Sequence, residues 1–142
     1  MKKYLILFFI SFAPFALGAS DICPNQNWKI STMEFSPSDP YLVTVLGFSY
    51  GPEVKRFIPK LSGAISRYYY EGSQSNSKVT FFSTYYANQS DATEAYKHLS
   101  SRIVGSELQK VLQKGKQVIW FGGRGISREC LLQVYDLESK RL

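Results

Sequence analysis

The N-terminal segment sets how much of this chain is left to fold. A short cationic start at residues 1–3 is followed by an apolar stretch over 5–17 and by small residues at 18–19. This order is typical of a cleavable secretory signal peptide. A permanent anchor is the alternative, but the apolar core is about 13 residues long and a helix needs about 20 to cross a bilayer. We therefore expect residues 1–19 to be removed and residues 20–142 to reach the periplasm as one domain without a stable membrane anchor.

Two cysteines remain in the exported chain, Cys23 near its start and Cys130 near its end. Thiols pair in an oxidising compartment such as the periplasm, so we predict a Cys23–Cys130 disulfide. Closing so long a loop stabilises a domain by about 4 to 5 kcal/mol in the chain-entropy model. Two unpaired buried thiols are the alternative. A metal site or a nucleophilic cysteine is disfavoured, because the chain has one histidine and its cysteines are far apart in sequence.

The exported chain is mildly basic. The full sequence has 17 Lys and Arg against 11 Asp and Glu. Loss of Lys2 and Lys3 leaves 15 basic residues against the same 11 acidic ones, a net charge of +4. Such an excess favours acidic partners: an acidic protein cleft, an anionic lipid or a cell-wall polymer. Nucleic acid is disfavoured, because the sequence has no dense stripe of Lys and Arg.

The first half of the exported chain predicts mostly strands. Residues 28–35 and 41–50 are rich in aromatic and β-branched residues and predict two strands, the second central because both its faces are apolar. A short helical turn follows, bounded by prolines. Residues 64–71 and 78–86 flank a polar segment and predict a β-hairpin. A helix over 64–70 is the competing interpretation, because so short a run does not settle the period.

The second half predicts the main helix, at about residues 91–104. Its apolar residues recur at helical intervals, and Asp91 stands three residues before Glu94, the spacing of a capping box. A second short helix is predicted over 106–112, with Gly115 as the left-handed residue at its C-terminal end. Apolar runs on either side of a glycine-rich tip then predict a C-terminal hairpin. The result is an α+β fold: an antiparallel sheet of four to six strands, with one main helix packed on it, in a single domain tied by the disulfide.

Catalytic candidates are few. His98 is the only histidine and could act as a general base, although a surface or half-buried helix histidine is far more common. The glycine-rich segment 122–125 lacks the Lys-Ser/Thr ending of a phosphate-binding loop, so a tight hairpin turn is the favoured interpretation. The carboxylates follow no motif that identifies an acid and base pair. We therefore expect no catalytic residue, no metal and no cofactor.

Two groups of residues are predicted to contact a partner. Arg124 lies in the glycine-rich tip and Arg128 follows it, and both carry planar guanidinium groups suited to carboxylates. Tyr69 and Tyr85 belong to aromatic runs that would place rings on both faces of the predicted hairpin, and tyrosine is common in protein interfaces. Ordinary core packing of the tyrosines and solvated charges on the loop are the alternatives.

The organisation of the precursor suggests a family. A short signal peptide without a lipoprotein cysteine, an α+β domain over residues 20–142, a terminal disulfide and no catalytic set together resemble the periplasmic immunity proteins that protect bacteriocin producers. In size and layout the chain is most similar to the pesticin-immunity type. The resemblance covers the whole precursor and rests on organisation, without a motif. It implies an inhibitor and not an enzyme. The implied partner is a protein toxin with an acidic cleft, such as a muramidase that degrades peptidoglycan with carboxylates in an open cleft.

Two other classes of function stay open on the sequence alone. A small secreted hydrolase would show turnover that depends on a group such as His98. A cell-envelope protein that binds glycan or anionic lipid would bind in a salt-sensitive manner. The residues do not indicate which surface binds, or an oligomeric state.

Overall fold

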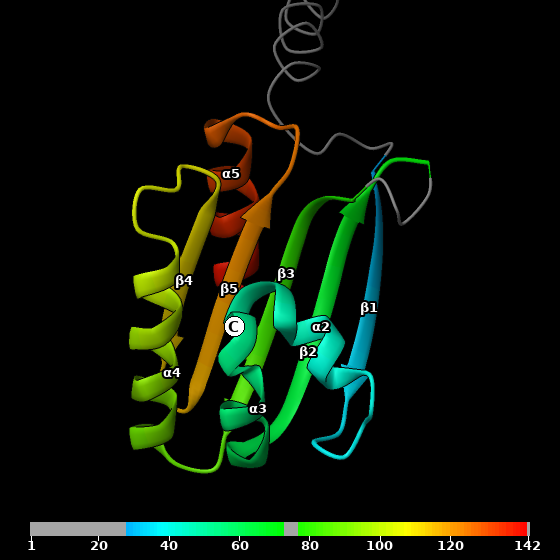
Figure 1. Cartoon of the computed structure of the whole chain (residues 1–142). Helices are drawn as coiled ribbons and strands as arrows, with labels where there is room; N and C mark the ends of the chain where they lie inside the picture. The colour runs from blue at the N-terminus through cyan, green and yellow to red at the C-terminus, as the bar shows by residue number, and fades with distance from the viewer. Residues whose placement is uncertain (1–27, 73–76, 142) are drawn as a thin grey trace, which may run out of the picture.

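The fold is a five-stranded antiparallel sheet with helices on both faces (Figure 1). It is seen in a computed structural model that describes residues 28–72 and 77–141. The strand order is β1-β2-β3-β5-β4. The strands are β1 (Lys29–Phe35), β2 (Leu61–Tyr70), β3 (Ser77–Tyr86), β4 (Gln109–Lys114) and β5 (Gln117–Gly123). The helices are α2 (Leu42–Tyr50), α3 (Val54–Phe57), α4 (Gln89–Arg102) and α5 (Arg128–Ser139), with 3₁₀ turns η1 (Gly51–Glu53) and η2 (Ile58–Lys60) around α3.

The sheet carries an apolar core on each face. Successive strand residues point to opposite faces, so Phe81 and Phe82 of β3 belong to different clusters. Phe82 packs beneath α2, α3 and α4, whereas Phe81 packs with Leu131 and Val134 of α5. Figure 1 shows α2, α3 and α4 in front of the sheet and α5 behind it. The predicted α+β class and the antiparallel sheet of four to six strands are thus confirmed. The prediction of one main helix is wrong, since the described residues form three longer helices.

Residues 41–50 form a helix and not the predicted central strand. Leu42, Leu46 and Tyr50 recur one helical turn apart, and all three are buried. A strand would place Phe48 on the same face as these three residues, yet its side chain is 78% exposed. The β-branched residues of this segment favour a strand only weakly, because β-propensity depends on the surface available for packing. Here a helix lets one apolar stripe cover the front of the sheet.

Residues 106–112 do not form the predicted short helix. They contribute instead to β4, which joins β5 in a tight hairpin where Lys114 pairs with Gln117. Gly115 was expected in the left-handed region at a helix end, and it has a φ of +57°. That conformation serves the two-residue hairpin turn, in which glycine is favoured.

The C-terminal segment forms a helix and not the predicted second strand of a hairpin. Ser127 caps α5, and its side chain accepts a hydrogen bond from the backbone N–H of Cys130 at 3.1 Å. Leu131, Val134 and Glu138 follow at helical spacing, and all are buried. The tip around Arg124 is therefore a loop between a strand and a helix. The physical reason is that the back of the sheet is apolar, and an amphipathic helix covers it.

Several local predictions are confirmed. β1, the helical turn that starts at Pro52 and the β2–β3 hairpin lie where the sequence indicates them. The main helix is α4, but its cap lies earlier than predicted: Asn88 accepts a hydrogen bond from the N–H of Asp91 at 2.9 Å. Within the described residues, no helix is both long and apolar enough to cross a membrane. The predicted signal peptide and Cys23 lie outside the described residues.

Candidate binding surface

Three basic residues gather where β5 leads into α5. The backbone N–H of Arg124 donates to the carbonyl of Lys78 at 2.8 Å, so the loop is held against the start of β3. The Nζ of Lys78 lies 3.8 Å from the point where a Cβ on Gly125 would stand. Arg128 is exposed in the first turn of α5. None of these three cations forms an ion pair with another described residue. We call Lys78, Arg124 and Arg128 the basic end.

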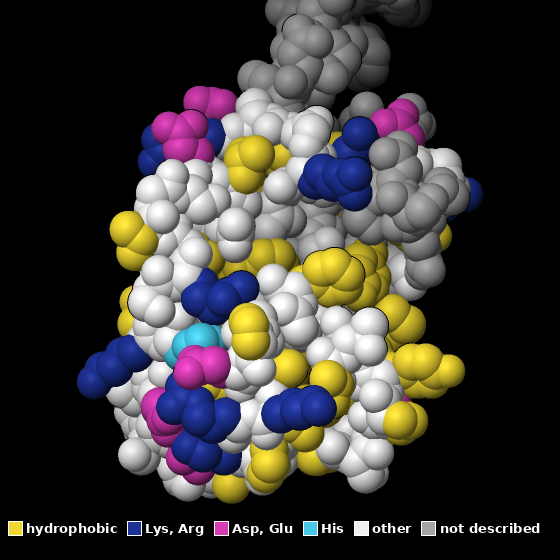
Figure 2. All heavy atoms as spheres, in the orientation of Figure 1, with side chains coloured by type: hydrophobic (Ala, Val, Ile, Leu, Met, Phe, Trp, Pro, Cys, Tyr) yellow, Lys and Arg dark blue, Asp and Glu magenta, His cyan; other side chains and the backbone are white. Residues whose placement is uncertain are grey.

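The basic end is a surface feature of the upper part of the molecule. Figure 2 shows basic side chains in dark blue at the end where the loop between β5 and α5 lies in Figure 1, with acidic side chains in magenta beside them. Arg124 follows the last residue of β5, and its backbone hydrogen bond limits how far the loop can move. Guanidinium groups bind carboxylates through two parallel hydrogen bonds, which the ammonium group of lysine cannot do. The basic end can therefore bind an acidic surface.

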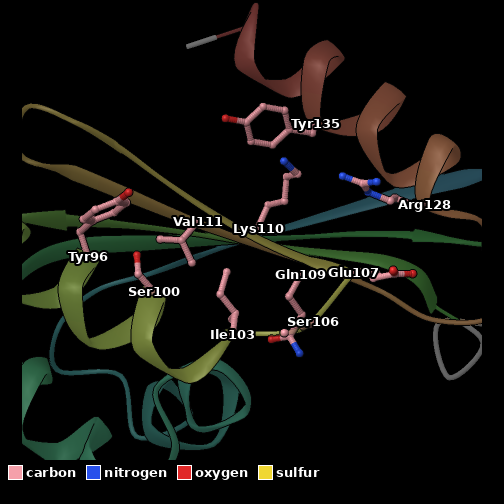
Figure 3. A pocket seen from close by; sticks show the side chains of 11 residues that line it. Tyr96, Ser100, Ile103, Ser106, Glu107, Gln109, Lys110, Val111, Arg128 and Tyr135 are labelled. Atoms are coloured by element: carbon pink, nitrogen blue, oxygen red, sulfur yellow. The ribbon is translucent and has the colours of Figure 1, made fainter.

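A hollow of about 500 Å³ adjoins the basic end (Figure 3). It lies between α4 and α5 and runs along β4. Arg128 belongs to its lining and so links it to the basic end. Lys110 also lines it, with its Nζ 5.6 Å from the centre of the Tyr135 ring. The hollow therefore combines cationic and aromatic side chains with one carboxylate, that of Glu107.

The two tyrosines predicted to contact a partner lie away from the basic end or beneath the surface. Tyr69 is 2% exposed under α5, where its hydroxyl donates to the carboxylate of Glu138. This burial removes it from the candidate contact residues. Tyr85 is half-buried and accepts a hydrogen bond from Gln117 Nε2 at 3.2 Å. It pairs with Gln117 at the end of β5 farthest from Arg124. The structure thus brings together Arg124 and Arg128, but not the tyrosines.

Sequence reasoning missed two basic residues of this region. Lys78 was assigned to a hairpin strand, and nothing in its local sequence relates it to Arg124. Their proximity follows from the antiparallel pairing of β3 with β5, which aligns Val79 with Gly123. Lys110 was missed because residues 106–112 were predicted as a helix. The glycine-rich segment before Arg124 was the one signal that pointed to this place.

His98 links α4 to the end of α2. Its Nδ1 lies 2.8 Å from a carboxylate oxygen of Glu53, and its Nε2 lies 2.8 Å from the carbonyl oxygen of Tyr50. Its ring packs against Phe57 at a centroid distance of 5.0 Å. Figure 2 shows the histidine in cyan beside acidic and basic side chains. Both ring nitrogens already have partners in this geometry, so the imidazole serves as a bridge between elements.

A buried chain of hydroxyl groups lies beneath α2. The Oη atoms of Tyr50 and Tyr86 are 2.5 Å apart, and Thr84 Oγ1 lies 2.8 Å from Tyr50 Oη. Burial raises the pKa of Tyr50 to about 12, against the opposing effect of its hydrogen bonds. Burial also raises the pKa of Tyr86. Both phenols are therefore neutral near pH 7, and they link the helix to the sheet.

Comparisons with known proteins leave the site to be interpreted on its own geometry. No protein-family model, no curated protein and no solved structure matches this chain. What the geometry offers is a basic end next to a hollow that runs along the edge of the sheet. This arrangement can bind an acidic macromolecular surface.

Proposed function

We propose that this chain is a periplasmic immunity protein that binds and inhibits a bacteriocin toxin, of the kind that degrades peptidoglycan. The observation that carries the proposal is the basic end, where Arg124 is hydrogen-bonded to Lys78 and Arg128 follows in the first turn of α5, none of them in an ion pair with another described residue. A muramidase works with carboxylates in an open cleft. A basic surface held by a hydrogen-bonded loop is electrostatically complementary to such a cleft.

The attachment of the loop favours tight binding. A flexible basic side chain loses rotamer freedom when it binds, and a fixed backbone reduces the remaining cost of ordering. Arg124 begins from a backbone already hydrogen-bonded to β3. Arg128 begins from a helix that covers the core. The basic end can therefore present its charges with little rearrangement, as a dedicated inhibitor requires.

Export and the disulfide complete the proposal. Trp28 packs against the cluster that contains Leu131, close to the start of α5. Cys23 precedes Trp28 by five residues, a length of chain that spans at most about 17 Å. This neighbourhood supports a bond between Cys23 and Cys130, which is buried in the first turn of α5. The bond would anchor the N-terminal end of the exported chain beside the basic end.

The test is inhibition of a pesticin-type muramidase. Peptidoglycan hydrolysis is measured with and without the oxidised chain of residues 20–142, and binding is measured by titration calorimetry. Arg124→Glu should weaken binding by about tenfold or more, because it places a carboxylate opposite an acidic cleft. Its melting temperature should stay nearly unchanged. Lys55→Glu is the matched control, since Lys55 is an exposed cation on α3 outside the basic end.

Two results would count against the proposal. Equal affinity for wild type and Arg124→Glu would remove the basic end from the interface. Salt-sensitive sedimentation with purified sacculi or anionic vesicles, with no effect on the muramidase, would identify an envelope-binding protein instead.

A further inference from the structure

β4 lies at an edge of the sheet, and β5 is the only strand with which it pairs within the described residues. Residues opposite one another in an antiparallel pair alternate between those that exchange hydrogen bonds and those that do not. The N–H of Gly123 donates to the carbonyl of Leu108 at 2.8 Å, which marks this opposed pair as hydrogen-bonded. The same alternation along the register makes Lys110 and Leu112 face β5 with their backbone groups.

The intervening residues of β4 therefore direct their backbone N–H and C=O groups away from the sheet. These residues are Gln109, Val111 and Gln113. No backbone hydrogen bond from elsewhere in the described residues reaches them. An edge of this kind is a template for an additional strand unless a protein covers or interrupts it. Residues 109–114 contain no proline and no bulge.

The hollow next to the basic end lies along this edge, between two different walls. The wall on the α4 side is formed by Tyr96, Ser100 and Ile103. The wall on the α5 side is formed by Arg128 and Tyr135, with Lys110 from β4. Figure 3 shows the two groups on opposite sides of β4. One wall is therefore largely apolar and hydroxylated, and the other carries two cations and an aromatic ring, with the carboxylate of Glu107 also in the lining.

We propose that the hollow is a strand-addition site, at which an extended segment of the protein partner pairs with β4 as a sixth strand. This inference rests on the proposed function and specifies how the partner is bound. Side chains alternate along a strand, so every second residue of the segment faces α4 and the others face α5. The segment that fits has apolar residues toward Ile103 and Tyr96 and acidic residues toward Lys110 and Arg128. The site thus selects an alternating acidic and apolar sequence.

Strand addition also explains why a chain would leave this edge open. In such recognition the backbone hydrogen bonds supply affinity, and the pockets for alternate side chains supply specificity. Gln109, Val111 and Gln113 each offer one donor and one acceptor to an incoming strand. Lys114 continues the cationic side, since it has the same parity as Lys110. The recognised feature is therefore both a backbone edge and a line of charge.

The test uses a synthetic peptide of eight residues in which glutamate and valine alternate, labelled for fluorescence anisotropy. Val111→Pro removes the outward N–H, at an edge position where proline does not interrupt the pairing with β5. Val111→Thr is the matched control, because it keeps the N–H and nearly the same volume. We expect Val111→Pro to lose about tenfold or more in affinity, and Val111→Thr to bind within about twofold of wild type.

A second measurement keeps the inference testable if Val111→Pro fails to fold. The same peptide, methylated on alternate backbone nitrogens, is titrated against the wild-type protein. Two such peptides are compared, methylated on the odd-numbered or on the even-numbered nitrogens. One of them should lose binding and the other should keep it, because only alternate residues of an added strand pair with β4. A peptide with lysine in place of glutamate should bind at least about tenfold more weakly.

Two outcomes would overturn strand addition. One is equal binding of the peptide to wild type and to a folded Val111→Pro. The other is an equal loss of affinity for the two peptides that are methylated on different sets of alternate nitrogens. The proposed function fails separately. If Arg124→Glu loses muramidase inhibition while Val111→Pro retains it, the immunity role stands and strand addition fails. If the peptide binds as predicted but the protein never inhibits the muramidase, strand addition stands and the immunity role fails.

Discussion

The carboxylate of Glu138 is the most consequential buried charge in the described residues. Glu138 lies on α5 and is 0% exposed. It accepts hydrogen bonds from the Tyr69 hydroxyl and from Arg67 Nη1, both on β2, and Arg141 Nη1 lies 3.5 Å away. Arg67 also lies over the Phe81 ring, with its Cζ 5.4 Å from the ring centre. This cluster joins α5 to β2, which β3 separates from β5 in the sheet, so it orients the helix on the back face.

The informative perturbation is Arg67→Met, which removes the cation and leaves the carboxylate in place. Removal of one partner of a buried ion pair costs about 3 to 5 kcal/mol, because the remaining charge is desolvated without compensation. A domain of this size has a total stability of about 5 to 15 kcal/mol. At about 4 °C per kcal/mol, the melting temperature should fall by about 12 to 20 °C. The hydrogen bond from Tyr69 and the ion pair with Arg141 remain, and both favour the lower end of this range.

The matched variant replaces the whole cluster with apolar groups. Arg67→Met combined with Tyr69→Phe and Glu138→Leu leaves no buried charge in this cluster of described residues, and such replacements are often neutral or stabilising. We therefore expect the triple variant to be more stable than Arg67→Met alone. Both are measured by thermal unfolding and by urea titration at constant pH. Two results would contradict this energetic cost of the buried carboxylate: Arg67→Met unfolds within about 2 °C of wild type, or the triple variant is less stable than Arg67→Met.

Two further predictions concern the buried tyrosine and the packing of a tryptophan. Folding raises the pKa of Tyr50 from 10.0 to about 12. The stability that the neutral phenol contributes should therefore be complete below pH 10 and decline by roughly 3 kcal/mol as the pH rises toward 12. Urea unfolding midpoints measured against pH should show this decline, and an equal decline in Tyr50→Phe would contradict it. A Cβ on Gly122 would stand 2.3 Å from Trp120 Cη2, so Gly122→Ala should cost about 1 to 3 kcal/mol and alter tryptophan fluorescence. Gly63→Ala is its control, since the nearest atom there is 3.9 Å away; equal effects of the two substitutions would refute the steric reasoning.

The sequence alone determined the elements whose signals are local and long enough. The β2–β3 hairpin has two extended runs around a polar segment, and α4 has a cap and a helical repeat over 14 residues. The antiparallel α+β class follows from these elements. The candidate site was predictable to the same extent: Arg124 stands between glycines and Arg128 follows four residues later, which is a local signal, and the structure places both where β5 leads into α5.

For segments that are apolar on more than one side, only the tertiary structure decided whether they form a helix or a strand. Residues 41–50 carry apolar residues at both strand and helix spacing, and the uncovered front of the sheet selects the helix. The same holds for α5, which covers the back face around Phe81 and Phe121. Lys78 and Lys110 join the arginines through strand pairing, which brings distant residues together. A short apolar segment does not specify its own period, because the favoured conformation is the one that buries its apolar side chains against the surface it meets.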